Sequence, residues 1–411
     1  MPSAKAPVPR FSTMRDIFDA LCRPGASPCI NLAAGMVELP PPAKLTELAS
    51  ELFLKQRVAE LSSIENPHMY RSRLGDAVFA EAVQLLQERL YTKATYSLDK
   101  ILVTNGVSGA VSSTLAMIAG RPRGQRPLRC GLFVPFYTYH QEAIKTMLPV
   151  DTEIVYMPLH DDMSFDFEAL EREAPGLDFV AFSNPGNPSC HALTEQEVRE
   201  FERIAAANPS MIVFSDEIYA DIMYDGKFHT FGPSSPSNIL VARGFSKILS
   251  VGSWRLAYVL GQPAILREVA TAHDRIFVGA NITQMAVGLY IRDHFDEFLE
   301  HIRTFNVTLC DNADLIIGAF EEHLGWTAIP GQGSMYRLIR HDRATDDEAF
   351  DLLVEKCAIA VVPGSLLAPP PGNKVAGNES TILVGICDMR AAQISSNADV
   401  RHPQPLLGVS P

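Results

Sequence analysis

The segment from Ala242 to Tyr258 sets one lysine among apolar and small residues, and it limits what this chain can fold into more than any other stretch does. Lys247 lies between Phe245 and Ile248, so we expect it to be partly buried. Burial lowers the pKa of a lysine and frees its amine to act as a nucleophile. Arg255 carries a planar guanidinium that suits a phosphate. On its own, the segment would be taken for a helix edge.

Two further motifs precede this segment. The run Ser183–Pro188 reads Ser-Asn-Pro-Gly-Asn-Pro, and the run Phe214–Tyr219 reads Phe-Ser-Asp-Glu-Ile-Tyr. Asp216 ends an apolar strand, and the carboxyl edge of a sheet is where α/β proteins form their sites. In this order and spacing the three motifs resemble those of the class I/II aminotransferases, which are fold type I enzymes dependent on pyridoxal 5'-phosphate (PLP). The resemblance runs from about Asn31 to about Asp388.

The resemblance implies an α/β fold, with a mostly parallel seven-stranded sheet in a large domain and a small α+β domain built from both termini. We assign residues 1–45 to an N-terminal arm that forms part of the small domain, residues 46–300 to the large PLP-binding domain and residues 301–411 to the small C-terminal domain. Helical patterns are expected at 14–22, 42–61, 76–90, 195–207, 263–273 and 281–299, the last continuing to 322.

The resemblance also assigns roles at the cofactor ring. Lys247 would hold the PLP aldehyde as a Schiff base, because lysine is the side chain that supplies an amine, and would then move a proton as general acid and base. Asp216 would keep the pyridine nitrogen protonated. Asn187 and Tyr219 would reach the phenolic oxygen. Tyr137, two residues after a proline that follows a strand, would offer a flat face for stacking.

The phosphate site is expected at a strand, a glycine turn and a helix that begins near Val107 and Ser108. Unpaired N–H groups at a helix start attract anions, although every α/β protein has such turns. Ser246 and Arg255 would add contacts. Tyr70, five residues before a glycine, matches a tyrosine that reaches the phosphate of the partner subunit in this family, so we expect a homodimer.

Several positions depart from the family pattern. Ser189-Cys190 replaces the usual Thr-Gly after Pro188, and Gly244 replaces a serine that contacts phosphate. The arginine that usually pairs with the substrate carboxylate should fall at Gly385. Arg390 is then the candidate substitute, and Gly35 is a second candidate for substrate binding.

Composition narrows the possible partners. The chain has 411 residues and a net charge of -13, which argues against binding to nucleic acid or anionic membranes. No apolar run is long enough to predict a membrane span. Its seven cysteines are an odd number without a C-x-x-C pair, which favours reduced thiols in a cytoplasmic protein over disulfides or a metal site.

We therefore expect a PLP-dependent aminotransferase that acts on an amino acid and a 2-oxo acid. A lyase, replacement or cyclisation enzyme of specialised metabolism on the same fold is the alternative, and Gly385 is the feature that favours it. A non-catalytic relic would be a third class. The retention of Lys247, Asp216, Asn187 and the other motif residues argues against a relic.

Overall fold

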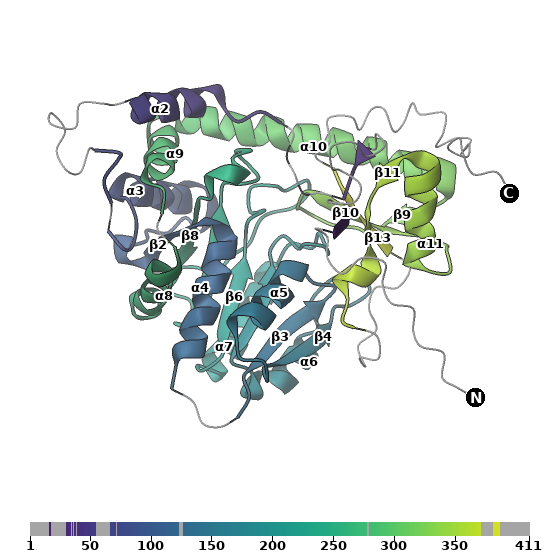
Figure 1. Cartoon of the computed structure of the whole chain (residues 1–411), viewed down its shortest axis with the longest axis horizontal. Coiled ribbons are helices and arrows are strands. Elements are labelled where there is room, and N and C mark those ends of the chain that lie inside the picture. The colour runs from purple at the N-terminus through teal and green to yellow at the C-terminus, as the bar shows by residue number, and fades with distance from the viewer. Residues whose placement is uncertain are drawn as a thin grey trace.

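The computed structural model describes residues 16–17, 30–33, 35, 37, 39–54, 66–70, 72–122, 126–277, 279–370 and 381–386. Its largest element is a seven-stranded sheet (Figure 1). From edge to edge, the strands are β2 (Ile101–Thr104), β8 (Ala257–Leu260), β7 (Ile239–Gly244), β6 (Ile212–Asp216), β5 (Phe179–Ser183), β3 (Arg129–Val134) and β4 (Glu153–Pro158). Only β8 runs antiparallel to its neighbours, so the expected seven-stranded, mostly parallel sheet is confirmed.

Both faces of this sheet are buried, and successive strand residues alternate between two cores. In β6, Ile212 and Phe214 contribute to one core and Val213 to the other, as the two-residue period of a strand requires. The first core includes side chains of helices α4 (Gly106–Gly120), α5 (Thr138–Met147) and α8 (Pro263–Ile276). The second includes side chains of α3 (Ala77–Leu86), α6 (Phe167–Glu173), α7 (Glu195–Ala207) and α9 (Asn281–Asp293).

Two smaller sheets lie to one side of the large sheet (Figure 1). One is the parallel pair β1 (Ile30–Asn31) and β11 (Ile359–Ala360), which joins segments from near the two ends of the chain. The other has the order β12 (Val362–Pro363), β13 (Thr381–Gly385), β10 (Tyr336–Arg340) and β9 (Thr327–Ala328). Helix α11 (Asp346–Asp351) packs against β12 and β13.

Helix α10 (Phe295–Leu324) contacts α9 near the large sheet and β9 in the small sheet (Figure 1). The predicted domain boundary at residue 300 therefore falls inside one continuous helix. The predicted helix 281–299 is wrong in its continuity, because His294 leaves the helical region of backbone space and separates α9 from α10.

The other helices lie close to their expected positions. The expected helix 195–207 is α7 itself, which begins with a capping box between Thr194 and Glu197. The expected helix 76–90 is α3, capped by the Asp76 side chain, followed by a π-helical turn at Gln87–Tyr91. Helix α2 (Ala43–Leu54) accounts for the first part of the segment 42–61. Most of the segments 14–22 and 55–61 lies outside the described residues. Within the described ranges, no helix is both long and apolar enough to cross a membrane.

Candidate active site

The motif residues from the sequence meet at one edge of the large sheet. Because β2, β3, β5, β6 and β7 run parallel, their carboxyl ends lie at the same edge. Tyr137 follows β3, Asn187 follows β5, Asp216 ends β6 and Lys247 follows β7. This is the edge at which open α/β sheets bind their ligands.

Lys247 is half-buried, and its Nζ donates a hydrogen bond to the Gly35 carbonyl at 2.5 Å. Gly35 therefore lies directly against the lysine amine. A Cβ at position 35 would stand 1.9 Å from the Tyr336 hydroxyl and 3.6 Å from Lys247 Nζ. Glycine is required here because the space that a side chain would need is already filled.

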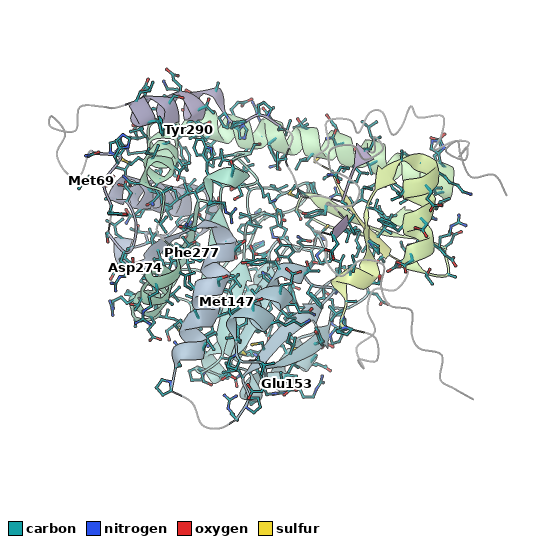
Figure 2. All side chains as sticks on the ribbon, in the orientation of Figure 1. Met69, Met147, Glu153, Asp274, Phe277 and Tyr290 are labelled. Atoms are coloured by element: carbon teal, nitrogen blue, oxygen red, sulfur yellow. The ribbon has the colours of Figure 1, made fainter. Side chains whose placement is uncertain are left out.

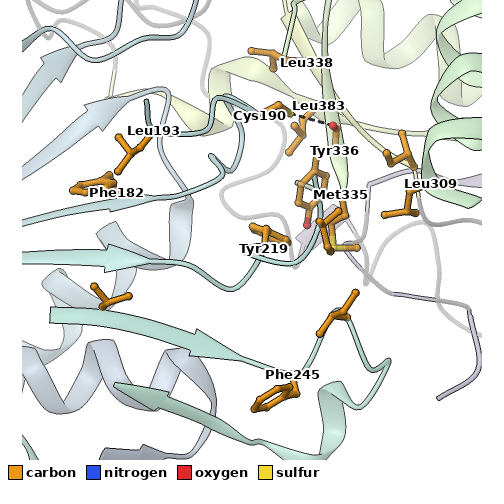
Figure 3. Close-up of a cluster of buried hydrophobic side chains, with 14 of the residues drawn as sticks. Phe182, Cys190, Leu193, Tyr219, Phe245, Leu309, Met335, Tyr336, Leu338 and Leu383 are labelled. Carbon is orange, nitrogen blue, oxygen red and sulfur yellow. Dashed lines mark hydrogen bonds between the residues drawn. The ribbon is translucent and has the colours of Figure 1, made fainter. Parts of the chain in front are cut away.

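Tyr336 is a site residue that the sequence reasoning missed. It lies in β10 directly opposite Gly385 of β13, and its ring meets Tyr219 edge-on at 6.0 Å between centroids. Figure 3 shows this ring extending from β10 toward Tyr219. The role of Tyr336 could not be read from spacing, because the residues it contacts are distant in sequence.

The turn after Asn187 carries Ser189 and Cys190 in place of the family's usual residues, and Cys190 packs against β10. Cys190 adopts the left-handed region with a φ of 59°, and its thiol donates to the Tyr336 carbonyl at 3.1 Å (Figure 3). Its backbone carbonyl accepts the N–H of Gln332 at 2.9 Å. Burial raises the pKa of the Cys190 thiol to about 12, so the thiol stays protonated and links the turn to β10.

Asp216 is 4% exposed and faces a histidine that the sequence reasoning did not identify. One carboxylate oxygen lies 3.1 Å from Nε2 of His140, and the other accepts the N–H of Ile218 at 3.2 Å. His140 lies in the first turn of α5, three residues after Tyr137, and its ring meets the Tyr137 ring edge-on at 5.5 Å. Residues three apart on a helix share a face, and that spacing was the available signal.

Asn187 and Tyr219 are both buried and lie side by side. The Asn187 amide nitrogen is 3.4 Å from the Tyr219 hydroxyl, and the amide oxygen has no hydrogen-bond partner among the described residues. Burial, with Tyr336 and Tyr137 nearby, raises the pKa of Tyr219 well above its ordinary value, so its hydroxyl remains a donor. An unmatched amide in a buried site is a place where a polar ligand atom fits.

The start of α4 is the predicted phosphate site, and Arg255 lies beside it. Gly106 has a φ of 71°, and a Cβ there would stand 2.4 Å from Nη2 of Arg255, so the guanidinium lies against the helix start. Val107 is buried, and Ser108 is half-buried. Ser246 is also half-buried. The backbone N–H of Asn105 donates to Nε2 of His273 at 3.2 Å. This hydrogen bond joins the turn before α4 to helix α8.

These groups fit PLP, which combines a phosphate, a ring nitrogen and a phenolic oxygen. The unpaired N–H groups of α4 and the Arg255 guanidinium suit the phosphate. The Asn187 amide nitrogen and the Tyr219 hydroxyl are donors that suit the phenolic oxygen, and the buried Asp216 carboxylate suits a protonated ring nitrogen. The Tyr137 ring is half-buried beside His140 and is the candidate for stacking against the cofactor ring.

Two predicted residues do not join this group in the described part of the chain. Arg390 lies outside the described residues. Tyr70 is 86% exposed. Among the described residues, no set of three or more His, Cys, Asp or Glu side chains could hold a metal ion.

Comparison with known proteins places these residues in context. The family model "Aminotransferase class I and II" matches residues 27–372. The chain is 24% identical over 318 residues to an aspartate aminotransferase of Sulfolobus acidocaldarius, covering 74% of this chain and 76% of the relative. It is 24% identical over 313 residues to a probable N-acetyl-LL-diaminopimelate aminotransferase of Bacillus subtilis, covering 73% and 74%.

Solved structures share the fold. N-succinyldiaminopimelate aminotransferase from Mycobacterium tuberculosis superposes with a TM-score of 0.80 at 19% identity, covering 95% of this chain and 97% of that one. YbdL from Escherichia coli, described with a methionine aminotransferase function, gives a TM-score of 0.78 at 18% identity, covering 98% and 99%.

Proposed function

This chain belongs to the class I and II aminotransferases, and we propose that its Lys247 carries the cofactor at the edge of the large sheet. The enzyme is a PLP-dependent aminotransferase that moves an amino group between an amino acid and a 2-oxo acid. The observation that supports this role for Lys247 is its convergence with Asn187 and Asp216 at the carboxyl ends of three adjacent strands. The alternative lyase or cyclisation reactions are not favoured, because the relatives named above are aminotransferases.

PLP supplies an electron sink for the negative charge that develops at the substrate Cα. Asp216 would hold the ring nitrogen in its protonated form, with His140 fixing the carboxylate from the other side. Lys247 Nζ would take the Cα proton as a general base. Tyr219 and Asn187 would donate to the phenolic oxygen, and Arg255 with the start of α4 would hold the phosphate.

Borohydride reduction of the PLP-loaded protein followed by peptide mapping tests the role of Lys247. The label is expected on Lys247, and Lys247→Ala should abolish it. Lys100→Ala is the matched control, because Lys100 is also half-buried and donates to a backbone carbonyl, that of Pro233 at 2.8 Å. A label that maps to another lysine would refute the assignment.

Substrate choice is the next part of the proposal. Gly385 stands opposite Tyr336 at the position where the family pattern places an arginine, and none of the described residues of β13 is an arginine. Removing one partner of a bidentate charged pair costs about 2–5 kcal/mol, and we therefore expect aspartate and glutamate to be poor donors. A larger or amine-like donor would bind through remote groups. A panel of single amino acids, with 2-oxo acid formation as the readout, decides this, and efficient turnover of aspartate or glutamate would refute it.

A homodimer is the proposed assembly. Large apolar side chains are exposed near the end of the molecule that α2, α3 and α8 form, including Phe53 (68%), Met69 (50%) and Tyr70 (86%). Figure 2 places Met69 and Asp274 at that end. Exposed apolar groups of this size mark association surfaces, and Tyr70 would reach the phosphate of a second copy. The compartment we propose is the cytoplasm, because Cys130, Cys190 and Cys310 are free thiols, as is usual for proteins in a reducing compartment.

A further inference from the structure

A buried ion pair lies beneath the candidate active site, between residues that the reaction itself does not use. Arg243 is 2% exposed and Glu217 is 1% exposed, and their side chains approach to 2.7 Å. Buried charges are rare unless they are paired and fully hydrogen-bonded. In the sequence, both residues resemble ordinary surface charges.

The contacts of the Arg243 guanidinium are numerous and well placed. Its Nε donates to Glu217 at 2.8 Å, Nη2 donates to the Thr230 hydroxyl at 2.9 Å, and Nη1 donates to Gln87 at 3.1 Å. Its charged centre lies 3.9 Å from the centroid of the Tyr91 ring, within the range of cation–π attraction. The guanidinium thus connects β7 to the turn that follows α3.

Glu217 accepts hydrogen bonds from the neighbouring strands. Its Oε1 lies 3.3 Å from the Asn184 amide nitrogen and 3.0 Å from the Ser215 hydroxyl. The Thr230 hydroxyl lies 2.8 Å from both carboxylate oxygens. Asn184 also donates its backbone N–H to the Asp216 carbonyl at 2.8 Å. The carboxylate therefore links β5 and β6, as the guanidinium links β7.

Each linked residue is close in sequence to a side chain that faces the cofactor. Asn184 is three residues before Asn187, Glu217 directly follows Asp216, and Arg243 is four residues before Lys247. Burial acts against the charged form of Arg243, but Glu217, Tyr258 and Tyr91 together outweigh burial and raise the pKa of the guanidinium above its ordinary value. The guanidinium is therefore charged in the folded protein.

We propose that Glu217 and Arg243 are positioning residues, and that their buried pair fixes the spacing of the cofactor-facing side chains on β5, β6 and β7. This inference rests on the function proposed above. Without the pair, the donors from Asn187 and Tyr219 would move away from the phenolic oxygen. With fewer donors, that oxygen would be more negative and would raise the pKa of the cofactor-bound nitrogen of Lys247.

The test uses the PLP-loaded protein and needs no substrate. The visible absorbance band of bound PLP changes with protonation of the Lys247 nitrogen. The pH midpoint of that change therefore reports how close Asn187 and Tyr219 lie to the phenolic oxygen. The double variant Arg243→Met/Glu217→Gln removes both charges and keeps an acceptor for Asn184. We expect its midpoint to rise by about one unit, a tenfold change in proton affinity, and its PLP dissociation constant to increase about tenfold, a change equivalent to one hydrogen bond. Arg243→Lys should give a smaller rise, because it keeps the charge but loses the forked contacts.

A matched control is Arg126→Met, which removes an arginine paired with Asp178 at 2.6 Å next to the opposite ends of the strands. It should leave the midpoint unchanged. A double variant that folds normally with the wild-type midpoint and PLP affinity would overturn the inference. If the double variant does not fold, Thr230→Val decides, because it removes contacts to the pair and leaves both charges. A shift in the same direction supports positioning, and no shift overturns it.

The two proposals fail in different ways. A wild-type protein that forms no PLP band on Lys247 would overturn both. A wild-type band with the expected midpoint behaviour, shared unchanged by the folded variants, would overturn only the positioning role.

Discussion

Gly106→Ala separates the phosphate contact from the stability of the fold. Gly106 occupies the first position of α4 in the left-handed region, with a φ of 71°. A new Cβ would stand 2.4 Å from Nη2 and 2.8 Å from Cζ of Arg255. Arg255 is exposed, so its guanidinium can move away while the helix start stays in place. The main effect should therefore fall on whatever the guanidinium binds.

The expected loss has two parts. The left-handed conformation costs an alanine about 1–2 kcal/mol, which should lower the free energy of unfolding by that amount. A hydrogen bond to a charged group contributes about 1.5–3 kcal/mol, and its loss should weaken PLP binding about 10- to 100-fold, since about 1.4 kcal/mol corresponds to a factor of ten. Only the second part depends on Arg255.

Titration of the apoenzyme with PLP, followed by absorbance, measures the affinity, and a thermal melt measures stability. Gly226→Ala is the matched control, because Gly226 has a φ of 73° and nothing lies within 4 Å of its would-be Cβ. It should show the same conformational cost and no loss of PLP affinity. If Gly106→Ala binds PLP within about threefold of Gly226→Ala, a factor worth less than 1 kcal/mol, Arg255 is not a phosphate ligand.

Three further predictions follow from the site. Asp216→Ala should bind PLP yet lose several orders of magnitude in turnover, at about 1.4 kcal/mol per tenfold, because the ring nitrogen loses its partner; near wild-type turnover would contradict this. Tyr70→Phe should weaken PLP binding in the dimer, and light scattering that finds an active monomer would rule out the role across subunits. Burial lowers the pKa of His273 in the folded protein, despite the nearby Asp274. The stability that depends on its neutral ring is therefore fully present above the unfolded pKa of about 6.5. It is lost as the pH falls from that value toward the lower folded pKa. Thermal melts from pH 8 to 5 should show this loss in the wild type and a smaller one in His273→Gln; identical profiles would refute it.

Sequence reasoning could place the candidate residues relative to the strands where a motif is local. Asn187, Asp216 and Lys247 each follow an apolar strand within a few residues, and the parallel order of strands then brings such ends together. The start of α4 was predictable for the same reason, because a strand, a glycine and a helix are contiguous in the chain.

The remaining site residues depend on contacts between distant segments. Arg243 reaches Gln87 across 156 positions, and nothing in the sequence distinguishes it from a solvated arginine. The closeness of Tyr336 to Gly35 depends on how β10 and the segment after β1 pack. The break at His294 could not be predicted either, since apolar residues continue with helical spacing on both sides of it.

The pairing of β1 with β11 has a consequence for how the chain is made. Residues Ile30–Asn31 leave the ribosome early, but their hydrogen-bonding partners Ile359–Ala360 are synthesised only after all seven strands of the large sheet. Domains tend to fold as units during synthesis, so the large sheet can form while the early strand still lacks its partner. Gly35 follows that strand closely. The contact between Gly35 and Lys247 is therefore expected to be among the last to form on a newly made chain.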